Sequence, residues 1–180
     1  MPIDIVQHLQ NRNYPRAIQL KRVVWGLLTP LFAWSPTPLY GWRNFLLRLL
    51  GANLGQGVRI HPSVRIMFPW NLHFADQVIV GRDVNLYALA SIRIHSHVLI
   101  SQGAHLCAGS HDYRHVNFPI AHAPIEIHSG TWIAADAFIG PGLVVGAGAV
   151  VGARAVVSRD VPPATVVVGN PARVIKHLTV

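Results

Sequence analysis

The amino-acid sequence predicts an all-β solenoid, a parallel β-helix with a short helical cap before it and a capping segment after it. Aliphatic residues recur every six positions over much of the chain, whereas helices repeat at about 3.6 residues and strands alternate at every second residue. Of the 180 residues, 51% are hydrophobic and 12% are charged, which is enough apolar material for a long core. Before residue 51 the apolar residues follow a helical spacing instead.

Residues 1–50 are expected to form the helical cap over the open end of the solenoid. The first apolar face carries Leu27, Leu28, Leu31 and Phe32, and the second carries Phe45, Leu46, Leu49 and Leu50. The most apolar run, residues 23–34, is shorter than the roughly 20 residues of a membrane-spanning helix. Six arginines and lysines against one acid give this segment +5 of the net charge of +8. Peripheral contact of residues 1–50 with an anionic membrane is the alternative to a purely structural cap.

Residues 51–180 are expected to form the solenoid itself. The repeat is clearest at Ile127, Ile133, Ile139, Val145, Val151 and Val157. Weaker blocks of the same period begin at Leu54, Val80 and Ile94, separated by phase jumps of two residues. Six residues suit one flat side of a prism, with a short strand, a turn and one inward aliphatic side chain. Stacked coils then bury a continuous column and pair their backbones in parallel, whereas a β-sandwich would show turns every 8–12 residues or so.

One interruption and two ends complete the expected architecture. The aliphatic position after Leu106 is Ile127, farther than the repeat allows, which predicts a loop insertion at about residues 112–124. The segment VPPATVVVGNPARVIKHL, residues 161–178, is expected to close the C-terminal end of the rod.

Composition argues against several classes of protein. A basic chain invites a nucleic-acid interpretation, but neither a recognition helix nor a basic face with stacking aromatics is evident, so no nucleic-acid partner is expected. The single cysteine, Cys107, excludes an internal disulfide framework and fits a reducing cytoplasm. The polar start MPIDIVQHLQNRNY is unlike a secretory signal.

Several segments resemble one known family. The repeat, GSHDY at residues 109–113, TWIAADAFIGPG at 131–142 and VVVGNPAR at 166–173 are similar to the hexapeptide-repeat acyltransferases. Together with the N-terminal run WGLLTPLFAWSPTPLYGWRNFLLRLLGANLG, they most resemble the acetyltransferases of colanic acid and other exopolysaccharide biosynthesis. The resemblance implies a left-handed β-helix, a homotrimer with active sites between subunits, and acetyl-CoA lying along the coils. It also implies a cytoplasmic enzyme that O-acetylates a sugar or oligosaccharide acceptor without a metal ion.

The resemblance places the chemistry at the edge of the insertion. His111 in GSHDY matches the family's catalytic histidine, and an imidazole can take a proton from a hydroxyl at neutral pH. Asp112 is interpreted as a contact for the acceptor or for the imidazole, with a turn role as the alternative. Tyr113 and Asn85 are candidates to line the acceptor site, although Ala88 stands where the subgroup is expected to have asparagine.

A second group of residues is assigned to acetyl-CoA by the same resemblance. Trp132, Ala134 and Ala135 match the stretch beside the pantetheine arm, where backbone amides can polarise the thioester carbonyl. Packing between subunits is the alternative role for Trp132. Gly152 and Ala153 are small enough for a cofactor to lie against the coil. Arg173 and Lys176 are suited to the CoA phosphates.

Two rival functions use the same fold. A γ-carbonic-anhydrase-like hydratase would need three imidazoles that converge on zinc from neighbouring coils and subunits. His105, His111, His115 and His122 are the candidates. A non-catalytic trimeric scaffold is the other rival, because a fold does not fix a function.

Overall fold

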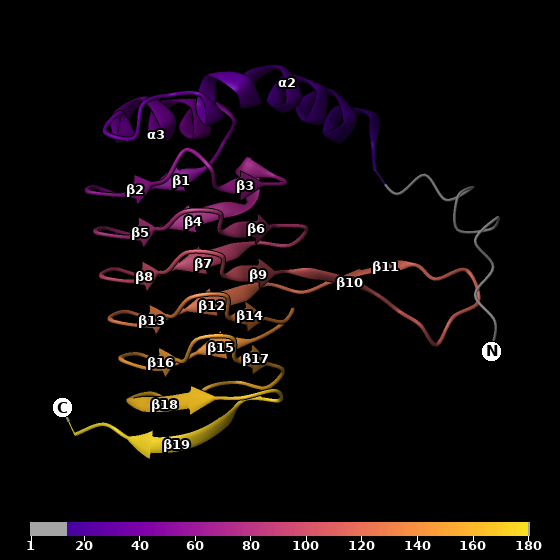
Figure 1. Cartoon of the computed structure of the whole chain (residues 1–180). Coiled ribbons are helices and arrows are strands. Elements are labelled where there is room, and N and C mark those ends of the chain that lie inside the picture. The colour runs from indigo at the N-terminus through magenta and orange to yellow at the C-terminus, as the bar shows by residue number, and fades with distance from the viewer. Residues whose placement is uncertain (1–13, 180) are drawn as a thin grey trace.

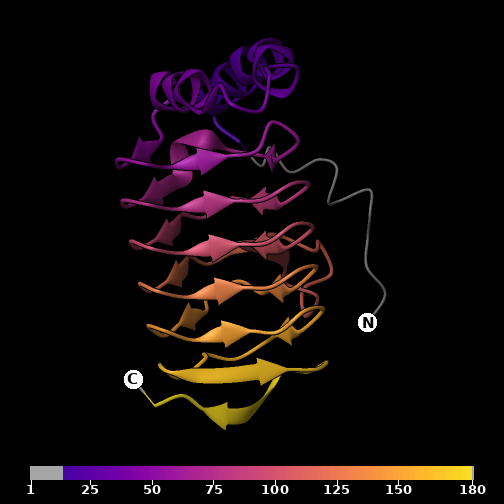
Figure 2. The ribbon, with the colours of Figure 1, turned by 60° about the vertical axis from the view of Figure 1, so that its left-hand side comes forward.

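A computed structural model describes residues 14–179 and confirms the parallel β-solenoid with a helical N-terminal segment (Figure 1). Residues 1–13 of the expected cap and Val180 lie outside the described residues. The short strands stack into three sheets that form the three faces of a prism (Figure 2). Each coil of the chain visits the first, second and third face in turn.

The strands of each face follow the order of the coils. The first face contains β1 (Asn53–Leu54), β4 (Leu72–Phe74), β7 (Ile92–Ile94), β12 (Ile125–Ile127) and β15 (Val144–Val145). The second face contains β2 (Arg59–Ile60), β5 (Ile79–Val80), β8 (Leu99–Ile100), β13 (Trp132–Ile133), β16 (Val150–Val151), β18 (Thr165–Val168) and β19 (Arg173–His177). The third face contains β3 (Arg65–Ile66), β6 (Asn85–Tyr87), β9 (His105–Cys107), β14 (Phe138–Ile139) and β17 (Val156–Val157).

The phase jumps in the sequence have a simple structural cause. On β7 both Ile92 and Ile94 point into the core, and on β4 Leu72 and Phe74 do the same. The corner between the third and first faces therefore holds two extra residues in the early coils. Leu54 pairs with Phe74, 20 positions later, whereas Ile127 pairs with Val145, 18 positions later. The early coils are thus longer by two residues, and the later coils are three plain hexapeptides.

The inward aliphatic residues form one continuous buried column. Ile60, Ile100, Ile133 and Ile139 are each fully buried, and full burial of such a side chain stabilises the fold by about 1.5–3 kcal/mol. Because every coil contributes to the same column, the rod is a rigid support for the side chains on its outer surface.

Two helices lie across the first coil (Figures 1 and 2). They are α2 (Arg16–Ala33) and α3 (Tyr40–Leu49), and they bury Trp25, Phe32, Leu46 and Leu47 against the end of the core. No helix within residues 14–179 has the length and apolar character that crossing a membrane would require.

Polar side chains of the helices also bond to the first coil. The bonds run from Trp25 Nε1 to Ile66 O (2.8 Å), from Arg43 Nε to Ile60 O (2.7 Å), from Asn44 Nδ2 to Val58 O (2.8 Å) and from Arg48 Nη2 to Leu54 O (2.9 Å). In the next coil the equivalent carbonyls, those of Phe74, Val78, Val80 and Leu86, accept bonds from the backbone of the first coil. The helices therefore supply the donors that a preceding coil would have supplied, which satisfies an otherwise open edge.

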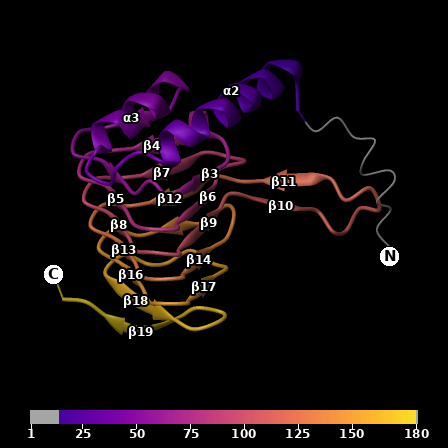
Figure 3. The ribbon, with the colours of Figure 1, turned by 45° about the horizontal axis from the view of Figure 1, so that its top comes forward.

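A β-hairpin leaves the rod between β9 and β12 (Figure 3). Its strands, β10 (Gly109–His111) and β11 (Ile120–His122), pair antiparallel, with His111 opposite Ile120. The insertion was expected at about residues 112–124, with His111 on the coil. The chain instead departs at Gly109, where an added Cβ would collide with Leu89, so His111 lies within the hairpin. At the other end of the rod, β19 folds back antiparallel on β18 and covers the last sheet edge.

Candidate active site

His111 is held in one orientation by the hairpin that carries it. Its Nδ1 lies 3.0 Å from the carbonyl oxygen of Phe118, and its ring stacks on the Phe118 ring at 4.3 Å with an interplanar angle of 6°. A carbonyl only accepts hydrogen bonds, so in the neutral imidazole the hydrogen is on Nδ1 and the basic lone pair is on Nε2. A general base requires this tautomer, because the unprotonated Nε2 accepts the proton while Nδ1–H stays bonded to the Phe118 carbonyl.

Asp112 and Tyr113 form the turn beyond His111. The Asp112 carboxylate accepts bonds from the Arg114 side chain (2.9 Å) and backbone (3.0 Å) and from His115 Nδ1 (3.0 Å). The Arg114 side-chain bond is the main reason that the pKa of Asp112 is held well below its usual range. The carboxylate is thus engaged with the hairpin tip, and Tyr113 is exposed there. Their roles towards an acceptor stay predictions.

Asn85 lies on the outer side of the third face and pairs with a histidine. Its Nδ2 is 3.2 Å from His105 Nε2, and the His105 ring meets the rings of Tyr87 and Phe138 edge-on. Burial, followed by the charge of Arg65, lowers the pKa of His105. Sequence reasoning missed this pair, although the 20-residue coil places positions 85 and 105 on neighbouring strands.

The residues assigned to acetyl-CoA lie at the corner between the second and third faces. Trp132 begins β13, is half exposed and donates its indole N–H to Ser101 Oγ at 2.9 Å. Ala134 and Ala135 follow β13, and Gly152 and Ala153 follow β16, which is the next strand of the same face.

Backbone bonds stack these two turns directly on one another. The Ala134 amide donates to Val151 O at 2.8 Å, and the Arg154 amide donates to Ala135 O at 2.9 Å. The Ala134 amide is therefore committed to the coil and not available to a thioester carbonyl. Glycine at position 152 permits close stacking of the last coil, because a Cβ there would lie 2.6 Å from Val168 Cγ1.

The two basic residues assigned to the CoA phosphates belong to the final strand. Arg173 and Lys176 are exposed on β19, opposite Val168 and Val166 of β18. The Arg173 guanidinium bonds the neighbouring carbonyl of Ala172 at 2.9 Å.

The predicted residues therefore fall into two groups within one chain. The hairpin with His111 leaves the corner between the third and first faces, whereas Trp132 to Ala135 and Gly152 to Ala153 line the corner between the second and third faces. A rigid prism separates the two groups, so a single chain does not bring the proposed base to the proposed cofactor groove.

A groove of about 520 Å³ lies beside the hairpin and was not predicted. The groove is lined by Tyr14 near the N-terminus, by Phe68, Trp70 and Asn71 of an early coil, and by Asn117, Pro119, Ile120 and His122 of the hairpin. Among the residues singled out from the sequence, His122 of the hydratase alternative lines it, whereas no residue assigned to acetyl transfer does.

Within one chain, the histidines of the hydratase alternative do not form a ligand set. Among residues 14–179, three donors close enough to share a metal ion are found at His95, Glu126 and His128. None of His105, His111, His115 and His122 belongs to that group.

Comparison with known proteins decides the family. No protein-family profile matches the sequence. The chain is 49% identical over 153 residues to a protein of Escherichia coli named "Putative colanic acid biosynthesis acetyltransferase WcaF", covering 85% of this chain and 84% of that protein. The chain belongs to the hexapeptide-repeat acetyltransferase family. It is therefore an enzyme of the acyltransferase class.

Solved structures agree with this assignment. A hexapeptide-repeat acetyltransferase of Vibrio cholerae, solved with acetyl-CoA, superposes with a TM-score of 0.85 at 30% identity, covering 93% of this chain and 92% of that one. A maltose O-acetyltransferase of Clostridium difficile superposes with a TM-score of 0.79 at 26% identity, covering 99% and 98%.

Proposed function

We propose that this enzyme transfers the acetyl group of acetyl-CoA to a sugar hydroxyl in the biosynthesis of a colanic-acid-like exopolysaccharide. The relative named for colanic acid biosynthesis and the V. cholerae neighbour solved with acetyl-CoA support this substrate pair. The observation that carries the chemistry is the orientation of His111, because its ring is fixed by Phe118 with the basic nitrogen on Nε2.

In this proposal His111 acts as the general base. Its Nε2 takes the proton of the acceptor hydroxyl while the hydroxyl oxygen forms a bond to the thioester carbonyl carbon. The carbon–sulfur bond breaks, and the proton passes to the departing CoA sulfur, so the products are an O-acetyl ester and free CoA. The Phe118 carbonyl stabilises the positive charge that the ring carries between the two proton transfers.

Removal of the imidazole tests the role of His111. We expect His111→Ala to lower kcat for thiol release from acetyl-CoA by about a hundredfold or more with a sugar acceptor present. His115→Ala is the matched control, because it removes another histidine from the same hairpin. Equal activity of the two variants would remove His111 from the mechanism.

We further propose a homotrimer whose active sites form between subunits. The hairpin projects away from its own rod (Figure 3), so His111 is suited to meet the alanine and glycine corner of a neighbouring chain. Closed rings of identical chains are the ordinary result of such head-to-tail contact.

A mixing experiment tests the shared site. His111→Ala removes the base, and Ala153→Glu places a negative charge at an exposed position of the proposed CoA groove. Each variant alone is expected to be nearly inactive. Co-expressed in equal amounts, they should regain about a quarter of the wild-type activity, since one in four interfaces then pairs two intact halves. No recovery in verified mixed trimers would place both halves of the site in one chain.

We also propose that the cap contacts an anionic membrane. Residues 14–50 contain no acidic residue, and Leu27, Trp34 and Phe45 expose 74%, 86% and 55% of their surface. An exposed apolar face with tryptophan and flanking basic residues is suited to a lipid interface.

Vesicle flotation tests this proposal. The protein should float with vesicles containing anionic phosphatidylglycerol, and Leu27→Gln with Trp34→Gln should abolish this. Unchanged recovery in the aqueous fraction would contradict it.

A further inference from the structure

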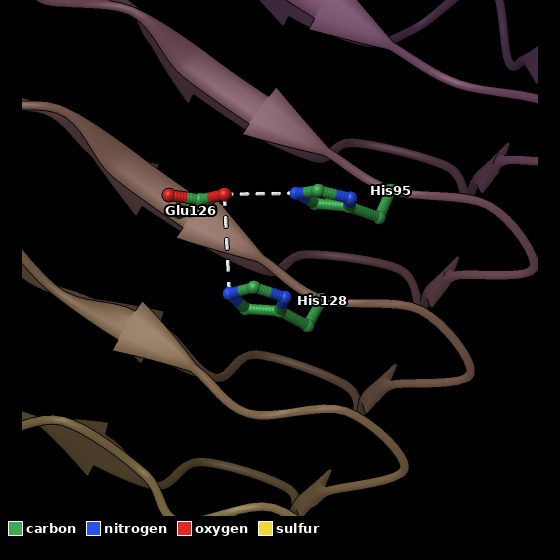
Figure 4. Close-up of side chains that lie close together, drawn as sticks. All are labelled: His95, Glu126 and His128. Atoms are coloured by element: carbon green, nitrogen blue, oxygen red, sulfur yellow. Dashed lines mark hydrogen bonds and ion pairs between the residues drawn. The ribbon is translucent and has the colours of Figure 1, made fainter.

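Three metal-ligating side chains meet on the outside of the first face, away from the residues assigned to catalysis. His95 follows β7, while Glu126 lies within β12 and His128 follows it (Figure 4). Glu126 Oε1 is 2.8 Å from His95 Nε2 and 3.9 Å from His128 Nε2. The two imidazole rings lie parallel, with centroids 4.7 Å apart and an interplanar angle of 10°.

The fold itself sets this arrangement. Strands β7 and β12 are neighbours, with Ile94 paired to Ile127, so His95 and His128 occupy consecutive rungs of one ladder. The ring separation matches the usual spacing of about 4.8 Å between strands. At the equivalent rung of other coils the chain has Gly55, Ala75 and Gly146, which are joined to the ladder by the same backbone bonds. The paired imidazoles are therefore not a feature of the repeat.

The donor set and its geometry suit a particular class of ion. Two imidazoles and a carboxylate are ligands for zinc and similar divalent transition metals, whereas magnesium and calcium prefer oxygen donors alone. Bond lengths of about 2.0–2.2 Å place tetrahedral ligand atoms roughly 3.3 Å apart. The three atoms here lie within 4.8 Å of one another on partly exposed side chains, so small rotations bring them to that distance.

The existing hydrogen bond shows which atoms a cation would engage. His95 Nε2 and Glu126 Oε1 lie 2.8 Å apart and share one hydrogen. A metal ion would replace the hydrogen between His95 and Glu126, leaving the His95 ring protonated on Nδ1, and water would complete the coordination.

We propose that His95, Glu126 and His128 bind a divalent transition-metal ion of the zinc type. The ion would join the coil before the hairpin to the coil after it. These coils are connected along the chain through the hairpin that carries His111. The ion would thus cross-link the two coils where the hairpin interrupts the solenoid, and it would take no part in acetyl transfer.

Zinc titration of the full-length, tag-free enzyme tests the proposal after treatment with a chelator. Calorimetry should show one Zn²⁺ per chain, and a hundredfold excess of zinc over Kd should raise Tm by roughly 5–10 °C. Co²⁺ should give the visible absorption of a tetrahedral site with nitrogen and oxygen ligands. His128→Ala and Glu126→Gln should each weaken Zn²⁺ binding by at least about tenfold. His177→Ala is the matched control, since His177 is an exposed histidine on β19, and it should bind zinc like the wild type.

Two results would overturn the proposal. One is zinc affinity that His128→Ala and Glu126→Gln leave unchanged, which would mean that other groups bind the ion. The other is the absence of a Tm rise at saturating zinc. In either case acetyl transfer by the same preparations is expected to continue, because the proposed function does not depend on this ion.

Discussion

Arg43 offers a sharp test of how the helices cap the solenoid. Its side chain is fully buried, and its guanidinium donates to Ile60 O (2.7 Å), Ser35 Oγ (2.8 Å), Pro36 O (2.9 Å) and Thr37 O. Burial lowers the pKa of Arg43, yet an arginine stays charged at neutral pH. The carbonyl dipoles of the first coil and of the turn between the two helices therefore stabilise the charged guanidinium.

Arg43→Met keeps the apolar length of the side chain and removes the donors. Each buried carbonyl left without a partner costs about 1–3 kcal/mol. Two carbonyls, Ile60 O and Thr37 O, lose their donor here, whereas Pro36 O keeps the bond from the Leu39 amide. Removing a buried charge also removes its desolvation cost, which offsets part of that loss. We expect a net destabilisation of about 2 kcal/mol, which corresponds to a Tm lower by about 4–8 °C.

Thermal unfolding followed by circular dichroism measures this effect. Arg16→Met is the control, because Arg16 lies on the exposed side of α2 and its replacement should leave Tm within about 1 °C. If Arg43→Met unfolds at the wild-type temperature, the row of cap-to-carbonyl bonds does not stabilise the end of the rod.

Three further substitutions have defined outcomes. The pKa of His105 is lowered in the folded protein, so the unfolded chain binds the proton more readily. The free energy of unfolding therefore falls as the pH drops below about 6.5. His105→Gln should reduce the difference in Tm between pH 7.5 and pH 5.5. Trp132→Phe removes an indole hydrogen bond at the proposed CoA groove, and KM for acetyl-CoA should rise about fivefold with kcat little changed. Gly146→Ala forces a Cβ against Pro163 and should cost about 1–3 kcal/mol in chemical denaturation, whereas Gly26→Ala, in open space within α2, should not destabilise.

The sequence period was sufficient to predict the prism, because each inward position needs an aliphatic side chain whatever its neighbours are. Ile133, Ile139 and Val145 repeat without interruption and are all fully buried. The same reasoning could not explain the phase jumps near Ile92 and Ile94. Two extra residues can either break the six-residue repeat or add a second inward side chain to the strand. Which of these occurs depends on the pairing of strands 20 residues apart, and the periodicity of one sequence gives no information on that pairing.

The residues at which the hairpin begins and ends, and the polar side chains that the cap buries, could not be predicted from the sequence for a related reason. The strand pairing of residues 109–111 with 120–122 depends on a tertiary register, and neither segment has marked alternation. Arginine is rarely buried, and nothing in the sequence marks Arg43 or Asn44 as an exception. Both are buried, because the open carbonyls of the first coil provide acceptors that only the assembled fold brings together.

The division of the predicted site between two corners follows from the rigidity of the solenoid. Motif resemblance assigns His111 and Trp132 to one reaction, but each corner of a stacked prism is fixed by the ladder bonds of every coil. No plausible movement within the chain turns one corner toward another without breaking those bonds. A hairpin projecting from one corner provides reach toward a second molecule, and its Phe118 contacts keep the imidazole oriented at that distance from the rod. The separation of the two groups in one chain is therefore a physical argument for an active site completed by a neighbour.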